Sequence, residues 1–241
     1  MNDSADNTGD TVEPAHPGAG LRAYLRLTIG LALVLLLLFW PAGTIDWRRG
    51  WLFYSILVAL AFYCVGWVGR DNPELFAARR RMPSNVKPWD AALIVLTILG
   101  WIAILPLAAL DDARFGWLPQ PVWVQLAGYV LLIAGFLGVT WAQSVNRHFE
   151  TTVRIQHDRG HTVVEAGPYA YVRHPGYAFA VTMSAGMALS LGSLVALIPV
   201  VMIKLALFLR TLAEDAELQR NLPGYAEYAA RVKHRWVPGV W

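Results

Sequence analysis

Five long apolar blocks constrain the fold of this chain more than any other feature of its sequence. The first four are each about 18 to 22 residues long, the length that a helix needs to cross a hydrocarbon layer of ~30 Å. Charged side chains make up only 15% of the 241 residues and apolar ones 56%, whereas soluble domains average roughly a quarter charged residues. We therefore expect an all-α integral membrane protein. The first block comes after Arg22 and Arg26 and runs to Trp40, and the others are residues 50–68, 89–110, 122–141 and 177–209.

The last block is too long for one crossing. Gly192 and Ser193 lie at its middle and are typical of a turn. We therefore expect two short helices, residues 177–191 and 194–209, that form a tight hairpin and bring the total to about six transmembrane helices. Pro106 and Pro199 fall inside these spans and predict kinks.

The basic residues lie unevenly between the blocks. Sixteen Lys and Arg residues fall on one side of the six-helix arrangement, three fall on the other, and Lys204 lies within the last span. By the positive-inside rule, both termini are expected in the cytoplasm. We interpret the chain as a multi-pass protein of a bacterial-type inner (plasma) membrane. Because the net charge of +3 reflects this placement, we expect no nucleic-acid partner.

The sequence divides into three regions. Residues 1–20 contain acids, Gly and Pro but no apolar run, and are expected to form a disordered tail. Residues 21–145 hold the first four transmembrane helices, and residues 146–241 hold the loop, the hairpin and a C-terminal segment. Because the outer loops are short, a polar site must be cytoplasmic and built from the loop before the hairpin and the segment after it.

The loop before the hairpin ends in a rigid polar motif. Pro175 restricts His174 to an extended backbone, so Arg173, His174 and Tyr177 present a cation, an imidazole and a phenol at one point of the membrane interface. In a second interpretation, Arg173 extends to lipid head groups and His174 only caps the turn. Alternating side chains also predict two short extended pieces, residues 152–156 and 162–165.

The segment after the hairpin begins with acids near the end of the last helix. Glu214 and Glu217 share a helix face, whereas Asp215 points elsewhere. Acids so close to a membrane need a polar cavity or a partner. Arg210, four residues before Glu214, is one such partner, and both interpretations stay open. The run Leu222-Pro223-Gly224 predicts the end of the helix.

Metal and disulfide chemistry find little support in the sequence. Cys64 is the single cysteine and lies within an apolar block, so we expect a packing residue. The histidines of the loop follow no metal-binding pattern, and we predict no metal site. These histidines are His148, His157, His161 and His174.

Four ordered motifs carry a family resemblance. They are Gly167-Pro168-Tyr169, Arg173-His174-Pro175-x-Tyr177, Glu214-Asp215-x-x-Leu218, and Gly224-Tyr225-x-x-Tyr228 followed by Arg235-Trp236-Val237-Pro238. Over roughly residues 141–241 the sequence resembles the isoprenylcysteine carboxyl methyltransferase family, which is related to phospholipid methyltransferases. The resemblance implies an S-adenosylmethionine-dependent methyltransferase, with a cofactor that enters from the cytosol and an acceptor that can enter from the bilayer.

The resemblance also implies roles for individual residues. Glu214 and Glu217 would receive the ammonium or the ribose hydroxyls, and Tyr169 and Tyr177 would face the sulfonium. Arg173 would orient an acceptor, with Asn146 as a further candidate. The expected partners are membrane lipids and a lipophilic or small carboxylate or thiol acceptor, with no obligate protein partner. The full set expected to bind the cofactor is Gly167, Tyr169, Arg173, His174, Tyr177, Glu214 and Glu217.

Two other functions remain open. Membrane sterol reductases resemble the same C-terminal region and would bind NADPH there, but the intact Arg173-His174-Pro175-x-Tyr177 motif favours a methyltransferase. A non-catalytic lipid-binding or transport protein would use the same charges only for topology. Lys204 is the only full charge within the spans, which gives little support to a transport path.

Overall fold

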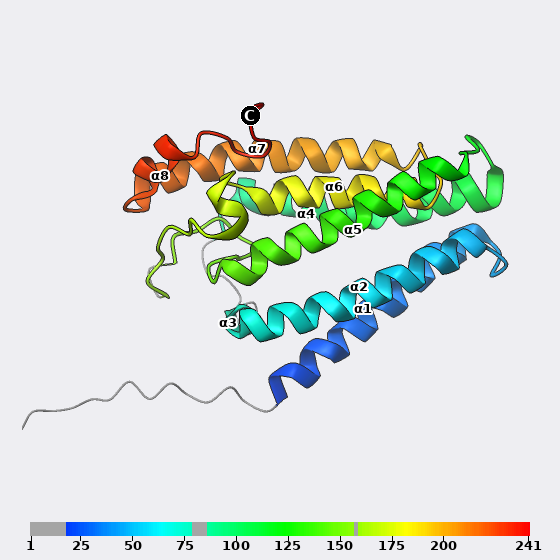
Figure 1. Ribbon diagram of the computed structural model, residues 1–241. Coiled ribbons are helices and arrows are strands. Elements are labelled where there is room, and N and C mark those ends of the chain that lie inside the picture. The colour runs from blue at the N-terminus through cyan, green and yellow to red at the C-terminus, as the bar shows by residue number, and fades with distance from the viewer. Residues whose placement is uncertain (1–17, 79–85, 157–158) are drawn as a thin grey trace, which may run out of the picture.

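The computed structural model describes residues 18–78, 86–156 and 159–241 (Figure 1). The predicted disordered tail therefore lies outside the described residues, except for residues 18–20, which already belong to the first helix. Three of the basic residues counted above, Arg79, Arg80 and Arg81, also lie outside them.

Within the described residues, four helices are long and apolar enough to cross a membrane. The predicted all-α fold is confirmed for the described residues, which contain no strand, and the pieces at 152–156 and 162–165 are unpaired non-helical backbone. The four are α1 (Gly18–Ala42), α2 (Arg48–Asp71), α4 (Pro88–Ala108), which continues as the π-helix η1 (Ala109–Phe115), and α5 (Val122–Val145). They are followed by α6 (Pro175–Ser190) and α7 (Leu197–Asn221), and the short elements are α3 (Pro73–Ala78), η3 (Gly167–Ala170) and α8 (Tyr225–Arg231).

The predicted break at Gly192-Ser193 is confirmed. Gly192 adopts a φ of 78°, a left-handed conformation that favours glycine. The next helix begins at Leu197 rather than Leu194, because the Leu197 amide donates to the Leu194 carbonyl in a preceding turn. The predicted kink at Pro199 is wrong, since this residue lies in the first turn of α7, where its missing N–H leaves no helical bond unmade.

The two helices that flank the polar loop, α5 and α6, pack backbone against backbone. A Cβ atom added at Gly128 would lie 2.2 Å from the Ser190 amide nitrogen, and one at Gly135 would lie 2.4 Å from that of Met183. Glycine is therefore required along this contact. Figure 1 shows α4, α5, α6 and α7 side by side, with the α1 and α2 pair crossing beside them.

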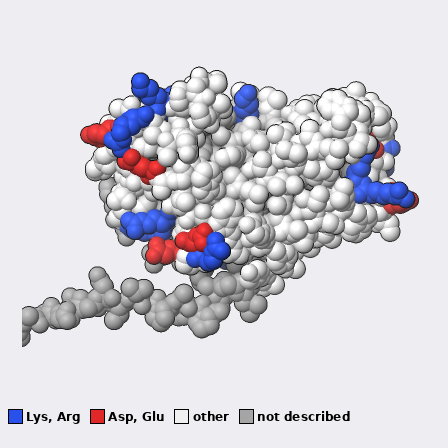
Figure 2. All heavy atoms as spheres, viewed as in Figure 1, with Lys and Arg blue, Asp and Glu red and all other residues white. Residues whose placement is uncertain are grey.

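Charge and apolar surface are segregated along the molecule. Figure 2 shows acidic and basic side chains gathered at the two ends of this face, with a broad and almost uncharged band between them. Large apolar side chains are exposed along the helices, including Leu36, Ile98, Leu126 and Val130. An exposed apolar band on helices of spanning length is typical of a surface that contacts lipid, and it identifies a membrane protein.

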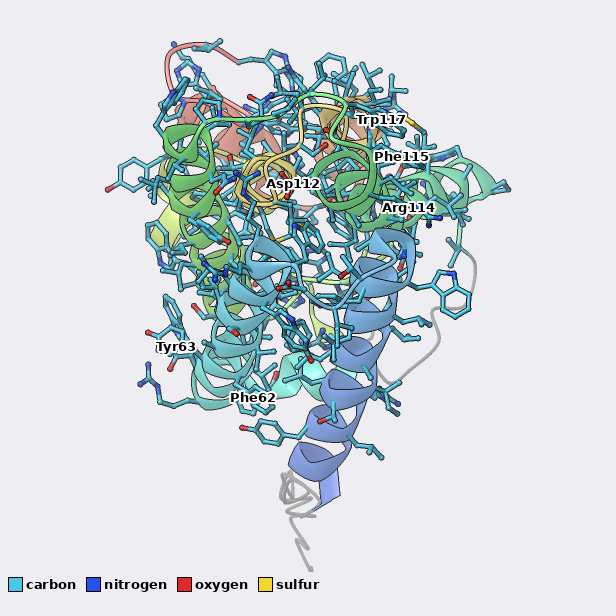
Figure 3. All side chains as sticks on the ribbon, turned by 90° about the vertical axis from the view of Figure 1, so that its right-hand side faces the viewer. Phe62, Tyr63, Asp112, Arg114, Phe115 and Trp117 are labelled. Carbon is cyan, nitrogen blue, oxygen red and sulfur yellow. The ribbon has the colours of Figure 1, made fainter. Side chains whose placement is uncertain are left out.

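The end of the bundle farther from the polar loop is held by a buried carboxylate pair. Asp112, which Figure 3 shows near the hairpin turn, accepts from the Trp47 indole at 2.7 Å and forms an ion pair with Arg49. Asp111 accepts the Ser193 hydroxyl at 2.6 Å. The Asp111 contact fixes η1 to the turn between α6 and α7, so the hairpin is anchored at its closed end, and the Asp112 contacts fix η1 to the start of α2.

Candidate active site

A cavity lies where the polar loop and the C-terminal segment meet, at the end of the bundle where Figure 1 shows α8. The space inside it that no atom occupies is about 870 Å³, including open solvent at its mouth. The hairpin has returned the two segments to the same face, as the sequence predicted.

Seven of the eight residues predicted for the site line this cavity. Gly167 is the exception: its φ is 59°, and its Cα faces the Trp141 indole and the Val145 side chain of α5. Gly167 therefore acts in a turn that packs the loop against the bundle. The seven that line the cavity are Asn146, Tyr169, Arg173, His174, Tyr177, Glu214 and Glu217.

Arg173 is bonded almost entirely within the protein. Its Nε and Nη2 atoms each donate to the Asp215 carboxylate at 2.8 Å, and Nη1 donates to the carbonyls of Val232 at 2.7 Å and Lys233 at 3.0 Å. Four of the five N–H groups of the guanidinium are thereby used. Because Arg173 is only 6% exposed, the interpretation in which it extends to lipid head groups is wrong.

Asp215 is the centre of this network, and the sequence did not single it out. Besides Arg173, its carboxylate accepts from the Tyr225 hydroxyl and Arg235 Nε, both at 3.0 Å, and lies 3.3 Å from His174 Nε2. Burial alone would raise the pKa of the Asp215 carboxyl, but the hydrogen bonds and charges of His174 and Arg173 hold it well below its usual range. Asp215 is therefore ionised and joins three of the four sequence motifs.

The two predicted acids on the neighbouring face do line the cavity. Glu214 accepts the Tyr177 hydroxyl at 2.5 Å. Glu217 forms an ion pair of 2.8 Å with Lys87, whose hydrogen bond is the main cause that lowers the pKa of the Glu217 carboxyl. The expected partner of Glu214, Arg210, instead pairs with Asp90. A cavity, rather than a surface ion pair with Arg210, explains the position of Glu214.

Asn146 is fixed at the end of α5. Its Nδ2 atom donates to the Tyr169 hydroxyl at 3.0 Å, its Oδ1 accepts the His148 amide at 2.8 Å, and its carbonyl accepts Asn72 Nδ2 at 3.1 Å. Burial raises the pKa of the Tyr169 phenol well above its ordinary value, so this phenol is neutral. Asn146 and Tyr169 thus form a neutral, preorganised corner of the cavity.

The outer wall of the cavity comes from residues that the sequence did not assign to the site. Thr152 Oγ1 is buried and has no hydrogen-bond partner within the described part of the chain. The rings of His148 and His161 pack with their centroids 4.4 Å apart, and burial lowers the pKa of His148. The alternation at residues 152–156 and 162–165 predicted extended backbone there, but it did not predict that these pieces line the cavity. Apolar side chains complete it, among them Phe149, Ile155, Val163, Leu218 and Leu222.

Within residues 18–78, 86–156 and 159–241, no group of three His, Cys, Asp or Glu side chains is placed to hold a metal ion. His157, one of the histidines considered above, lies outside these ranges.

Comparison with known proteins bears directly on this cavity. Residues 126–220 match the model of the isoprenylcysteine carboxyl methyltransferase (ICMT) family, whereas no curated protein matches the chain. The matched region runs from α5 through the loop and hairpin to the end of α7, and therefore includes most of the cavity wall. The resemblance predicted from the motifs is confirmed for this region, and it indicates a membrane methyltransferase.

Proposed function

On the premise that residues 126–220 carry the chemistry of the family whose model they match, we propose that the protein transfers a methyl group from S-adenosylmethionine to an acceptor at the cytoplasmic face of the membrane. The acceptor is a lipophilic molecule or a small carboxylate or thiol. One observation carries the proposal: seven residues that the sequence predicted for the site line one cavity.

The residues of the cavity fit this cofactor. S-adenosylmethionine has an ammonium, a carboxylate, a sulfonium and an adenine, and so needs acids, hydrogen-bonding groups and apolar surface. Glu214 and Glu217 supply two carboxylates, Thr152 supplies a buried hydroxyl that lacks a protein partner, and Val163 and Leu222 supply apolar surface. A buried polar atom without a partner is costly unless a ligand or water satisfies it, which supports a ligand at this wall.

When bound, S-adenosylmethionine supplies a methyl group on a positively charged sulfur. The chain has to hold the two reactants in line and exclude water, and good alignment contributes as much as ~7 to 11 kcal/mol. Tyr169 is neutral and adds no competing negative charge, while Glu214 and Tyr177 are held together by their hydrogen bond. The Asp215 network fixes the C-terminal segment against the loop.

The acceptor is oriented by the amide of Asn146 and the remaining N–H of Arg173. Asn146 Nδ2 has a second hydrogen beyond the one that it donates to Tyr169, and Arg173 retains one of its five N–H groups. A carboxylate or thiolate acceptor is already ionised and needs no general base. Most of the bonding capacity of Arg173 serves to fix Asp215 and the C-terminal carbonyls.

We further propose that α6 and α7 cross the membrane with the other four helices, which gives six crossings and two cytoplasmic termini. The 16 residues of α6 span about 24 Å at 1.5 Å per residue, and local thinning of the bilayer accommodates the difference from a hydrocarbon layer of ~30 Å. Both helices lie alongside α4 and α5 in the same bundle (Figure 1). This arrangement leaves the cavity at the cytoplasmic end, where the basic residues concentrate. It corresponds to four helices up to residue 145 and a catalytic region at 146–241 of an inner-membrane protein.

Titration of the purified full-length protein with S-adenosylmethionine, and separately with NADPH, tests the function. We expect saturable binding of S-adenosylmethionine and none of NADPH. Binding of NADPH alone would replace the methyltransferase with a reductase, and binding of neither would favour the lipid-binding alternative.

A further inference from the structure

A buried ion pair lies beside the cavity but does not line it. Arg210 Nε is 2.9 Å from Asp90 Oδ1, and the two side chains are 9% and 0% exposed. Asp90 lies in the first turn of α4, and Arg210 lies on α7 one turn before Glu214. A buried ion pair contributes little net stability by itself, because desolvation of both charges opposes their attraction. Its position therefore requires another explanation.

The pair holds the outer wall of the cavity through two backbone hydrogen bonds. The Val153 amide donates to Asp90 Oδ2 at 2.7 Å, and Arg210 Nη2 donates to the Thr151 carbonyl. Thr152, between these two residues, lines the cavity and carries the hydroxyl without a protein partner. The wall has no helix or strand to define its backbone, so these two bonds set where Thr152 and Val153 lie.

The same pair also borders the ligand-facing aromatic ring. The Arg210 guanidinium carbon lies 5.6 Å from the centroid of the Tyr177 ring, within the range of a cation–π contact. The Tyr177 hydroxyl is in turn bonded to Glu214. Arg210 therefore contacts two sides of the cavity: the outer wall through the Thr151 carbonyl, and the side that carries the Tyr177 ring.

We propose that Asp90 and Arg210 are positioning residues, which fix the segment 151–153 and the Tyr177 ring at the spacing that the ligand requires. This inference rests on the proposed binding of S-adenosylmethionine. It assigns to α4, which lies outside the matched region 126–220, a direct part in shaping the site. The role of the first helices is then more than membrane anchoring.

Two variants and a matched control test the proposal. Asp90→Asn leaves an oxygen for the Val153 amide but removes the charge, and Arg210→Lys keeps the charge but loses the fork that reaches both Asp90 and Thr151. Asp112→Asn is the control, because Asp112 is also a buried partner of an arginine but lies at the opposite end of the bundle. We expect both test variants to raise the Kd for S-adenosylmethionine at least ~10-fold and the control to change it less than ~2-fold.

Hydrogen exchange of the same proteins supplies a readout that needs no ligand. We expect the Val153 amide to exchange faster in Asp90→Asn and Arg210→Lys than in the wild type and in Asp112→Asn. If Asp90→Asn does not fold, the neutral double variant Asp90→Asn/Arg210→Gln removes the uncompensated charge and takes its place.

Each outcome decides the matter. An unchanged Kd, or a Kd that rises equally in Asp112→Asn, overturns the positioning role. If the wild type itself does not bind S-adenosylmethionine, the proposed function fails, and exchange alone decides whether the pair holds the wall: faster exchange at Val153 supports this, and unchanged exchange overturns it.

Discussion

The Glu214→Gln substitution isolates the charge of one carboxylate that lines the cavity. Glutamine has nearly the same shape, and its side-chain oxygen can still accept the Tyr177 hydroxyl that Glu214 accepts at 2.5 Å. What is lost is the negative charge that would face the ammonium of S-adenosylmethionine. A hydrogen bond between charged groups contributes roughly 1.5 to 3 kcal/mol, so we expect the Kd to rise by about 10- to 150-fold at 1.4 kcal/mol per decade.

Tyr177→Phe is the matched control for this measurement. It removes the hydrogen bond to Glu214 and leaves the carboxylate charged; because this bond lies within the protein and the charge that would face the ammonium is kept, we expect the Kd to rise less than ~10-fold. Equilibrium binding should be measured in detergent at one fixed ionic strength, because salt screens the charge–charge contact. A Kd for Glu214→Gln within error of the wild type would refute the reasoning, since the cavity would then not use this charge.

Three further predictions address the arginine, the histidine wall and the topology. Arg173→Lys should leave the protein folded in detergent but lower methyl transfer at least ~10-fold, because lysine cannot make the paired contact with Asp215 and also reach both C-terminal carbonyls. Near-normal turnover would show that the planar guanidinium is dispensable. Arg231→Lys, at an exposed ion pair, serves as the control. The lowered pKa of His148 means that the folded protein keeps this ring neutral. The stability that the neutral ring contributes is therefore present above the ordinary pKa of 6.5 and should be lost as the pH drops below that value. Thermal unfolding between pH ~7.5 and ~5 should show this fall in stability with pH, and His148→Gln should make it smaller. In a Cys64→Ala background, a cysteine at Pro119, which is exposed in the loop before α5, should react with an impermeant external reagent and one at Gln219 should not; protection of the first would contradict six crossings.

Local sequence patterns predicted much of this structure because they report on local physics. The apolar blocks required helices of membrane-spanning length, and Gly192-Ser193 marked a turn that the left-handed backbone at Gly192 confirms. The candidate residues were also brought together as predicted, since a hairpin must return its two flanking segments to the same face. Asn146 and Glu214, far apart in the sequence, line the same cavity for this reason.

Long-range pairing was beyond such patterns. Helical periodicity showed that Asp215 faces away from Glu214, but it could not show that Arg173 and Arg235 lie beside Asp215 on that face. The partner of Arg210 was sought four residues along the same helix, whereas it lies on α4. In both cases tertiary packing places a charge closer than any local neighbour does, and buried charges take the partner that best compensates their lost hydration.

The backbone contact between α5 and α6 has a consequence for the loop that forms the cavity wall. The loop leaves α5 at Asn146 and enters α6 at Pro175. The close backbone contact at Gly128 and Gly135 holds these two helices at a fixed separation. The entropy of bringing the ends of the loop together is therefore spent during folding, before any ligand arrives. A ligand then has to order only the side chains that touch it, which leaves more of its contact energy for affinity.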